Sequence, residues 1–140
     1  MALLFVYGTL KEGFCNFKWN EGRRIPGDFA TVELFQLYVL GPFSLPWMVE
    51  AGGQGLQVKG QLYEVTEEQL SELDKFERVD EPGWLTRKLV LVRAQSSPSA
   101  EPVQAYVYLG DPEAVRAQTI HLGPVAEYTR EMDAKYGDPA

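Results

Sequence analysis

Glycine and proline divide most of this chain into short apolar segments, and this spacing is the strongest constraint on its fold. Short runs rich in β-branched and aromatic residues between turn residues are typical of strands. Such runs lie at residues 3–7, 30–40, 45–49, 56–65, 84–93 and 103–109, with loops expected at 11–24 and 96–102. Because these strands do not alternate regularly with helices, the pattern predicts an α+β fold, mainly antiparallel, most simply a small β-barrel with few helices.

The clearest helix signal begins at Thr66. Gln69 follows three residues later, which is the spacing of a capping box. The predicted helix continues to about Arg78 and ends before Pro82-Gly83, since proline cannot continue a helix.

Two weaker helix signals lie near the end of the chain. Asp111-Pro112 is typical of an N-cap followed by a first-turn proline and predicts a short helix. A second helix is predicted from Gly123-Pro124 to about residue 137, because Val125, Tyr128 and Met132 would share one face.

Length and charge restrict the classes of function. The chain has 140 residues, which suits a single domain spanning residues 1–140. It carries 13 Lys and Arg against 20 Asp and Glu, and its formal net charge of -7 argues against nucleic acid as a partner.

Its single cysteine, Cys15, excludes a disulfide framework and a multi-cysteine zinc site. No apolar run approaches the ~18 residues of a membrane span, and no signal peptide is recognisable. We therefore expect a cytoplasmic protein without a membrane association.

Glu77 is the first candidate for chemistry. Leu70, Leu73 and Glu77 are spaced three and four residues apart, so the carboxylate shares the apolar face of the predicted helix. A carboxylate there must be paired, hydrogen-bonded or protonated. One interpretation is a helix-end acid bonded to a nearby arginine or backbone N–H. The other is a general base whose pKa is raised by burial and by neighbouring carboxylates.

The second candidate is Tyr7-Gly8-Thr9-Leu10, where a predicted strand runs into a glycine. Because Gly8 lacks a Cβ, a ligand can approach the backbone, and successive N–H groups can hold a carboxylate or an oxyanion. The alternative is that Gly8 serves only as a turn residue.

Taken together, the two candidates resemble the motifs of a known family. Residues 5–13, Phe-Val-Tyr-Gly-Thr-Leu-Lys-Glu-Gly, with Asn16 beyond, are similar to the opening motif of the gamma-glutamylcyclotransferase-like family. Leu-Asp-Lys-Phe-Glu at residues 73–77 resembles the family's Leu-Asp-x-Phe-Glu motif. Residues 45–47 and 60–65 also resemble family segments, in the expected order. The similarity covers about residues 1–109 and is greatest to the gamma-glutamylamine cyclotransferases. The residues from 111 onward contain no motif specific to the family.

The resemblance implies a small mixed barrel and an enzyme that releases 5-oxoproline from a gamma-glutamyl compound, without metal or cofactor. By position in the motifs, Glu77 would be the proton acceptor, and Tyr7, Gly8, Thr9 and Leu10 would line the glutamyl pocket. The chain departs from many relatives after the helix, where Leu85 stands in place of a tyrosine. Trp84 is expected to fill that space and to form the wall that faces the leaving group.

Several functions remain compatible with these motifs. The substrate is expected to be a gamma-glutamylamine such as gamma-glutamyl-epsilon-lysine. A gamma-glutamyl amino acid or a protected biosynthetic intermediate would undergo the same chemistry. A non-catalytic module that binds a small acid is the alternative from another class, although such a module does not need a buried carboxylate at Glu77. The sequence leaves the oligomeric state open.

Overall fold

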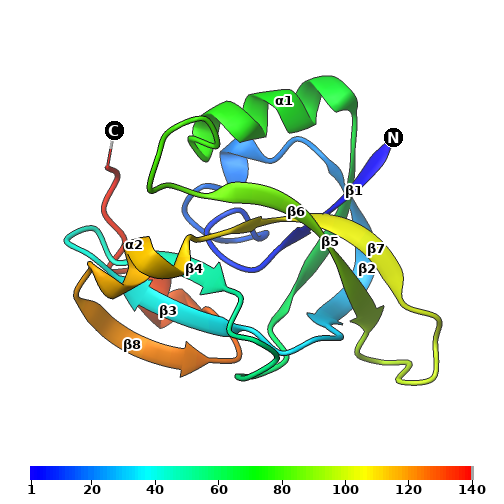
Figure 1. Ribbon diagram of the computed structural model, residues 1–140. Helices are drawn as coiled ribbons and strands as arrows, with labels where there is room; N and C mark the ends of the chain where they lie inside the picture. The colour runs from blue at the N-terminus through cyan, green and yellow to red at the C-terminus, as the bar shows by residue number, and fades with distance from the viewer. Residues whose placement is uncertain (140) are drawn as a thin grey trace.

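The computed structural model describes residues 1–139 and contains a closed barrel (Figure 1). The barrel follows the order β1 (Ala2–Val6), β5 (Lys59–Val65), β2 (Arg23–Thr31), β6 (Thr86–Ala94) and β7 (Val103–Leu109). Four of the strand pairings are antiparallel, and the pairing of β1 with β7 is parallel. The prediction of a small, mixed and mainly antiparallel barrel is therefore confirmed.

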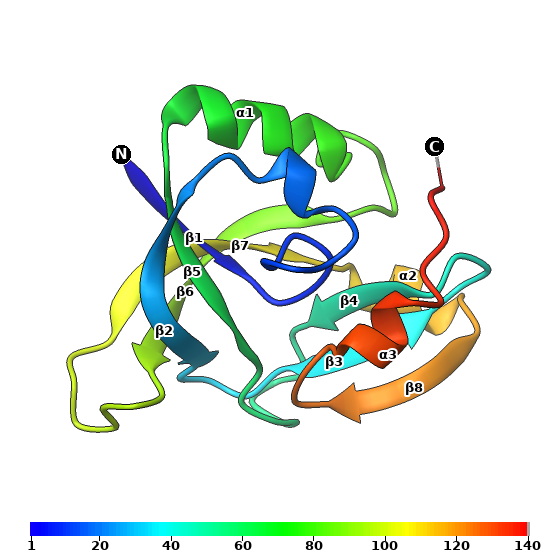
Figure 2. The same ribbon diagram turned by 180° about the vertical axis from the view of Figure 1, so that it is seen from behind.

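A second sheet packs beside the barrel, in the order β4-β3-β8 (Figures 1 and 2). It consists of β3 (Gln36–Leu40), β4 (Leu45–Val49) and β8 (Ile120–Val125). β4 is an edge strand, as Pro46 predicted. The Gly110 N–H donates to the Met48 carbonyl over 2.8 Å, which ties the end of β7 to β4.

The prediction of one strand over residues 30–40 is wrong, because the chain changes sheets within it. β2 ends at Thr31 and β3 begins at Gln36. Thr31 Oγ1 donates to the Glu33 carbonyl and accepts from the Val58 N–H, at 2.8 and 2.9 Å. These bonds turn the chain out of the barrel and into the second sheet.

Helix α1 (Glu67–Phe76) crosses one side of the barrel (Figure 1). Its capping box is formed as predicted, with the Gln69 N–H donating to Thr66 Oγ1 over 3.0 Å. Leu70 and Leu73 are buried against the barrel, so the apolar stripe of the helix is its inner face. The other helices are short: η1 (Phe17–Trp19), α2 (Pro112–Arg116) and α3 (Arg130–Asp133).

The helix predicted from Gly123-Pro124 is wrong, since these residues belong to β8. Gly123 has a φ of +124°, which is outside the helical region. Pro124 is tolerated because β8 is an edge strand. Tyr128 is fully buried in the main core, with Val125 and Met132 packed against the same core. The spacing of these residues therefore reflects a common core contact and not a continuous helix. The loop expected at residues 11–24 needs a smaller change, since it contains η1 and the start of β2. The short helix predicted at Asp111-Pro112 is confirmed as α2, at residues 112–116.

The core has two parts. One fills the barrel and the space between barrel and second sheet, and it includes Phe5, Tyr7 and Tyr128. The other lies under α1 and includes Tyr63 and Trp47. Within residues 1–139, no helix is long and apolar enough to cross a membrane.

Candidate active site

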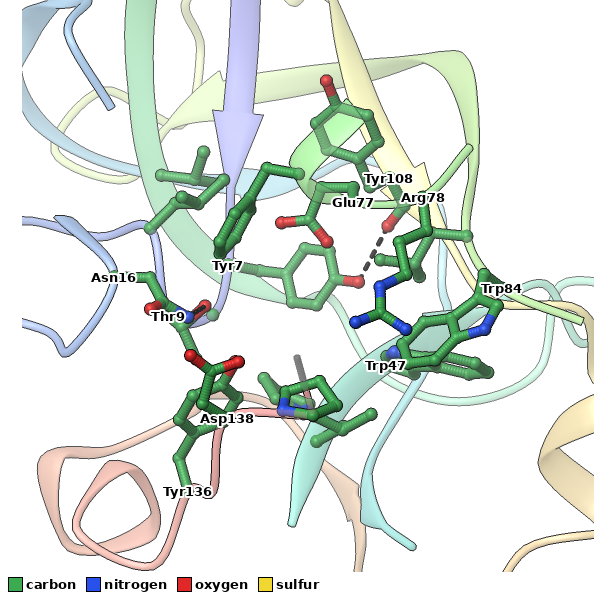
Figure 3. A pocket seen from close by; sticks show the side chains of 18 of the residues that line it. Tyr7, Thr9, Asn16, Trp47, Glu77, Arg78, Trp84, Tyr108, Tyr136 and Asp138 are labelled. Carbon is green, nitrogen blue, oxygen red and sulfur yellow. Dashed lines mark hydrogen bonds between the residues drawn. The ribbon is translucent and has the colours of Figure 1, made fainter. Parts of the chain in front are cut away.

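The two motif segments meet at a partly open cavity of about 270 Å³ (Figure 3). Its walls come from the end of β1 and the following loop, from β4, from the end of α1, and from the segment before β6. Every residue singled out from the sequence as a site residue lines this cavity: Tyr7, Gly8, Thr9, Leu10 and Glu77. The fold thus brings together segments that are about seventy residues apart.

Glu77 is the C-cap of α1, and its side chain points into the cavity (Figure 3). Burial raises the pKa of its carboxyl from the ordinary 4.5 to about 7. The expected contribution of neighbouring carboxylates is not seen. Glu72 and Glu81 are largely exposed, and desolvation is the cause of the shift. A carboxyl group with this pKa is half-ionised near neutral pH and can both accept and return a proton.

The alternative in which a nearby arginine neutralises Glu77 does not fit the ion pairs around it. Arg78 contacts Glu81 at 3.9 Å, and Arg87 contacts Asp74 at 3.4 Å. Within residues 1–139, the acids that these two guanidinium groups contact are therefore Glu81 and Asp74, and not Glu77.

The last turn of α1 is held by bonds that fix the direction of Glu77. The Arg78 N–H donates to the Lys75 carbonyl and the Val79 N–H to the Asp74 carbonyl, each over 3.1 Å, which is a Schellman ending. The Asp74 carboxylate also accepts a 2.8 Å hydrogen bond from the Tyr108 hydroxyl of β7. The helix end is thereby anchored to the barrel.

Tyr7 lies beside Glu77 in the cavity (Figure 3), but its hydroxyl is occupied by the backbone. The hydroxyl donates to the Tyr108 carbonyl over 2.7 Å and accepts from the Met48 N–H over 3.1 Å. Burial and, to a smaller extent, the charge of Glu77 raise the pKa of this phenol above its ordinary value. Tyr7 therefore joins β7 to β4 and presents its ring, not a free hydroxyl, to the cavity.

The structure gives Gly8 a packing role that the sequence did not reveal. A Cβ at this position would lie 2.9 Å from Pro46 Cγ, so the missing side chain accommodates β4. Gly8 still lines the cavity, where its backbone is available for contact with a ligand.

Thr9 and Leu10 are fixed by two asparagines beyond the motif. Asn16 Nδ2 donates to Thr9 Oγ1 over 3.0 Å, and the Asn16 N–H donates to the Thr9 carbonyl over 3.0 Å. Asn20 Nδ2 donates to the Leu10 carbonyl over 3.1 Å. The loop is a preformed element, because buried side-chain amides replace the ladder bonds that it lacks.

The opposite wall is aromatic. Trp84 and Trp47 pack edge to face with ring centroids 5.8 Å apart, and the Arg78 guanidinium lies over Trp84, 4.4 Å from the centroid of its ring. Leu85 is buried and lines the cavity beside them. Trp84 and Leu85 thus share the position where many relatives are expected to carry a tyrosine.

The end of the chain also contributes to the cavity, which no sequence motif indicated. Tyr136, Asp138 and Pro139 line it, although nothing specific was expected after residue 111. The Gly137 N–H donates to the Phe43 carbonyl over 2.8 Å, which fixes this segment against the β3–β4 turn. Burial raises the pKa of Tyr136, and a hydrogen bond with the Asn16 side chain opposes that rise. The only sequence signal for this contact is that Tyr136 is an aromatic residue within a polar segment.

A larger hollow of about 500 Å³ lies elsewhere on the surface and is strongly polar. Several of its charged groups are already paired. Arg24 pairs with Glu12 and Asp28 at 3.2 and 3.3 Å, and Lys11 Nζ donates to the Tyr128 carbonyl over 2.6 Å. The cavity at Glu77 is therefore the better candidate for chemistry.

The fold and the cavity define a class: a small mixed barrel in which one desolvated carboxyl group faces a pocket with a preformed loop on one side. Among residues 1–139, no cluster of His, Cys, Asp or Glu is placed to hold a metal ion. The chemistry that this arrangement supports is proton transfer to and from a bound small molecule.

Comparison with known proteins identifies the family. The family model described as gamma-glutamyl cyclotransferase, AIG2-like, matches residues 4–129. Gamma-glutamylaminecyclotransferase of Rattus norvegicus is 38% identical over 117 residues, covering 77% of each chain. The Homo sapiens protein of that name is 34% identical over 121 residues, covering 77% of this chain and 78% of its own. A crystal structure of an AIG2-like protein from Mus musculus has a TM-score of 0.78 at 33% identity, covering 99% of this chain and 96% of that one. This chain belongs to the gamma-glutamyl cyclotransferase, AIG2-like family, as its motifs predicted.

Proposed function

We propose that this protein is a gamma-glutamylcyclotransferase that releases 5-oxoproline from a gamma-glutamylamine, such as gamma-glutamyl-epsilon-lysine. The observation that carries this proposal is Glu77, whose carboxyl group lies in the cavity with a pKa of about 7. Its position next to the loop of residues 7–10 gives a substrate both a binding surface and a proton acceptor.

The reaction is an intramolecular acyl transfer. The substrate's α-amine attacks its own γ-carbonyl carbon, so a new N–C bond closes the five-membered ring and the bond to the leaving amine breaks. Folding the substrate into this geometry is worth about 7–11 kcal/mol of the barrier. Glu77 accepts the proton that the attacking amine loses and returns it to the leaving amine. One carboxyl group thus serves both steps, and the protons balance.

The loop and the ring of Tyr7 serve substrate binding in this proposal. The backbone of Gly8, Thr9 and Leu10 lines the cavity next to Glu77 and would receive the glutamyl end. Preorganised N–H groups in such a loop favour a carboxylate or a developing oxyanion, because they need no reorganisation during the reaction. The bonds from Asn16 and Asn20 hold this loop in place.

The leaving amine is assigned to the wall formed by Trp84, Leu85 and Trp47. An indole surface accommodates the methylene stem of a lysine-like amine. The relatives named gamma-glutamylaminecyclotransferase support the same choice. We expect gamma-glutamyl-epsilon-lysine to be a better substrate than glutathione, whose second half carries more amide groups to desolvate.

Two other functions fit part of the evidence. The same chemistry on a gamma-glutamyl amino acid or a protected biosynthetic intermediate would use the same loop and the same Glu77. A binding module without activity would use only the loop. The desolvated carboxyl of Glu77 favours an enzyme, since burying it raises its pKa without benefit to binding alone.

The test is an assay for 5-oxoproline across a panel of gamma-glutamyl compounds, with wild type and Glu77→Gln. Glutamine keeps the size of the side chain but cannot shuttle a proton, so turnover should fall by at least about 10²-fold. Glu72→Gln, on the exposed face of the same helix, is the matched control and should remain fully active. Circular dichroism and thermal melting confirm that both variants fold. Full activity in Glu77→Gln would contradict the proposal.

A further inference from the structure

Arg78 adopts a backbone conformation that arginine normally avoids. Its φ is +57°, and within residues 1–139 only Ser44 shares a positive φ among the non-glycine residues. Arg78 occupies the position just after the C-cap, where glycine is usual because it carries no Cβ. Backbone outliers of this kind cluster at functional sites, and Arg78 directly follows Glu77.

The left-handed conformation places the guanidinium at the wall of the cavity. Arg78 lines the cavity, and its guanidinium lies over the ring of Trp84 at 4.4 Å from the centroid. Its ionic contact with Glu81 is 3.9 Å long, which is beyond hydrogen-bonding distance. A guanidinium that stacks by its face keeps its N–H donors at its edge, in the geometry that binds a carboxylate with two parallel bonds.

The position of Arg78 within the cavity fits the leaving group. Figure 3 shows Arg78, Trp84 and Trp47 on one side, Thr9, Asn16, Tyr136 and Asp138 on the other, and Glu77 between them. If the glutamyl end binds at the loop, the leaving amine of the substrate extends past Glu77 towards Arg78. Lys75 also lines the cavity, but its ammonium is paired with Glu72 at 3.3 Å, so Arg78 is the cation that would meet the leaving amine.

We propose that Arg78 determines specificity by binding a carboxylate on the leaving amine. The protein would then select gamma-glutamylamines whose amine ends in a carboxylate, such as side-chain-linked lysine, over those that end only in an amine or a methyl group. The indole of Trp84 receives the methylene stem and Arg78 the carboxylate beyond it. This inference rests on the proposed function and names the substrate class for the same cavity.

The experiment compares gamma-glutamyl-epsilon-lysine with gamma-glutamylcadaverine. The two have the same stem and terminal ammonium and differ only in the carboxylate. Wild type should prefer the lysine conjugate by about 10–100-fold in kcat/KM, the range of a hydrogen-bonded charge. Because the loss of kcat/KM falls mainly on the lysine conjugate, Arg78→Gln should lose that preference. Arg78→Lys, which keeps the charge without the planar fork, should retain part of it.

Two further variants separate recognition from structure. Arg78→Gly removes the guanidinium and suits the left-handed backbone, so it should fold well and lose the preference as Arg78→Gln does. Arg116→Gln, in the last turn of α2, is the control and should behave as wild type. An equal loss on both substrates would mean that Arg78 only positions Glu77, and the proposal would be overturned.

The remaining outcomes distinguish this inference from the proposed function. Release of 5-oxoproline from both conjugates at the same rate by wild type would overturn the role of Arg78 and leave the proposed function intact. Release from neither conjugate, nor from any other gamma-glutamyl compound in the panel, would overturn both.

Discussion

The two sides of the cavity are built in different ways. On one side, the loop of residues 7–10 follows directly from β1 and is tied by hydrogen bonds to β4, β7 and two buried asparagines. On the other side, Arg78 and Trp84 project from the connection between α1 and β6 and hold each other by stacking. The first side is part of the framework of the fold, whereas the second lies in a connection outside the barrel strands. The proposed function assigns recognition of the shared glutamyl group to the first side and selection among amines to the second.

The largest effect is expected at Glu77, which lies between the two sides. With a pKa of about 7, its base form disappears as the pH falls. We expect kcat/KM to drop about 50-fold between pH 7 and pH 5, with the slope approaching about tenfold per pH unit below pH 6. Substrates that differ only in the leaving amine should show the same midpoint. A profile that stays flat down to pH 5 would contradict the role of Glu77 as base.

The raised pKa of Glu77 also affects how the free energy of unfolding depends on pH. The direction of this dependence is opposite to that of an acid whose pKa is lowered by an ion pair. A carboxyl group whose pKa is higher in the folded state stabilises the fold below its unfolded pKa of about 4.5, and this stabilisation is lost as the pH rises towards 7. The cost of the ionised form at pH 8 is about 3 kcal/mol at most. Glu77→Gln should therefore be more stable than wild type at pH 8, with a difference that shrinks as the pH falls towards 4.

The next effect concerns the framework side. Gly8→Ala places a Cβ about 2.9 Å from Pro46 Cγ, so the fold must shift or β4 must move away. Such overpacking costs about 1–3 kcal/mol and should lower the melting temperature by several degrees. Pro46→Ala removes the Cγ atom that the new Cβ would contact, so the double variant should recover much of the lost stability. Purely additive losses would show that Gly8 is required for another reason.

The smallest effect is expected on the amine side, where a substitution should increase stability and not reduce it. Arg78→Gly relieves the left-handed strain and should raise the free energy of unfolding by about 1 kcal/mol, offset in part by the lost stacking on Trp84. Denaturant melts at pH 7 measure the difference. A clear loss of stability would place Arg78 in the framework and remove the contrast between the two sides.

The barrel and α1 could be predicted because their signals are local. Strand composition between turns and the capping box at Thr66 are properties of neighbouring residues, and they place β1, β5, β7 and α1 within a few positions. The two motifs placed Glu77 and the loop at one site. The apolar spacing of Val125, Tyr128 and Met132 misled because burial in an irregular segment can imitate a helical period.

The features that could not be predicted depend on tertiary packing. The change of sheet between Thr31 and Gln36 has no composition signal of its own. An arginine in the left-handed region cannot be recognised from its residue type, because only glycine is typical there. Tyr136 reaches the cavity through a backbone bond from Gly137 to Phe43, about ninety residues away.

The hydroxyl of Tyr7 has a mechanical consequence for the whole cavity. Met48 is held at both of its backbone groups, since its N–H donates to Tyr7 and its carbonyl accepts from Gly110. The barrel and the second sheet are therefore joined at a buried residue whose N–H is bonded to Tyr7, and Tyr7 lines the cavity with Glu77. We therefore expect separation of the two sheets to break both Met48 bonds, so exchange of the Met48 amide proton with solvent reports that separation.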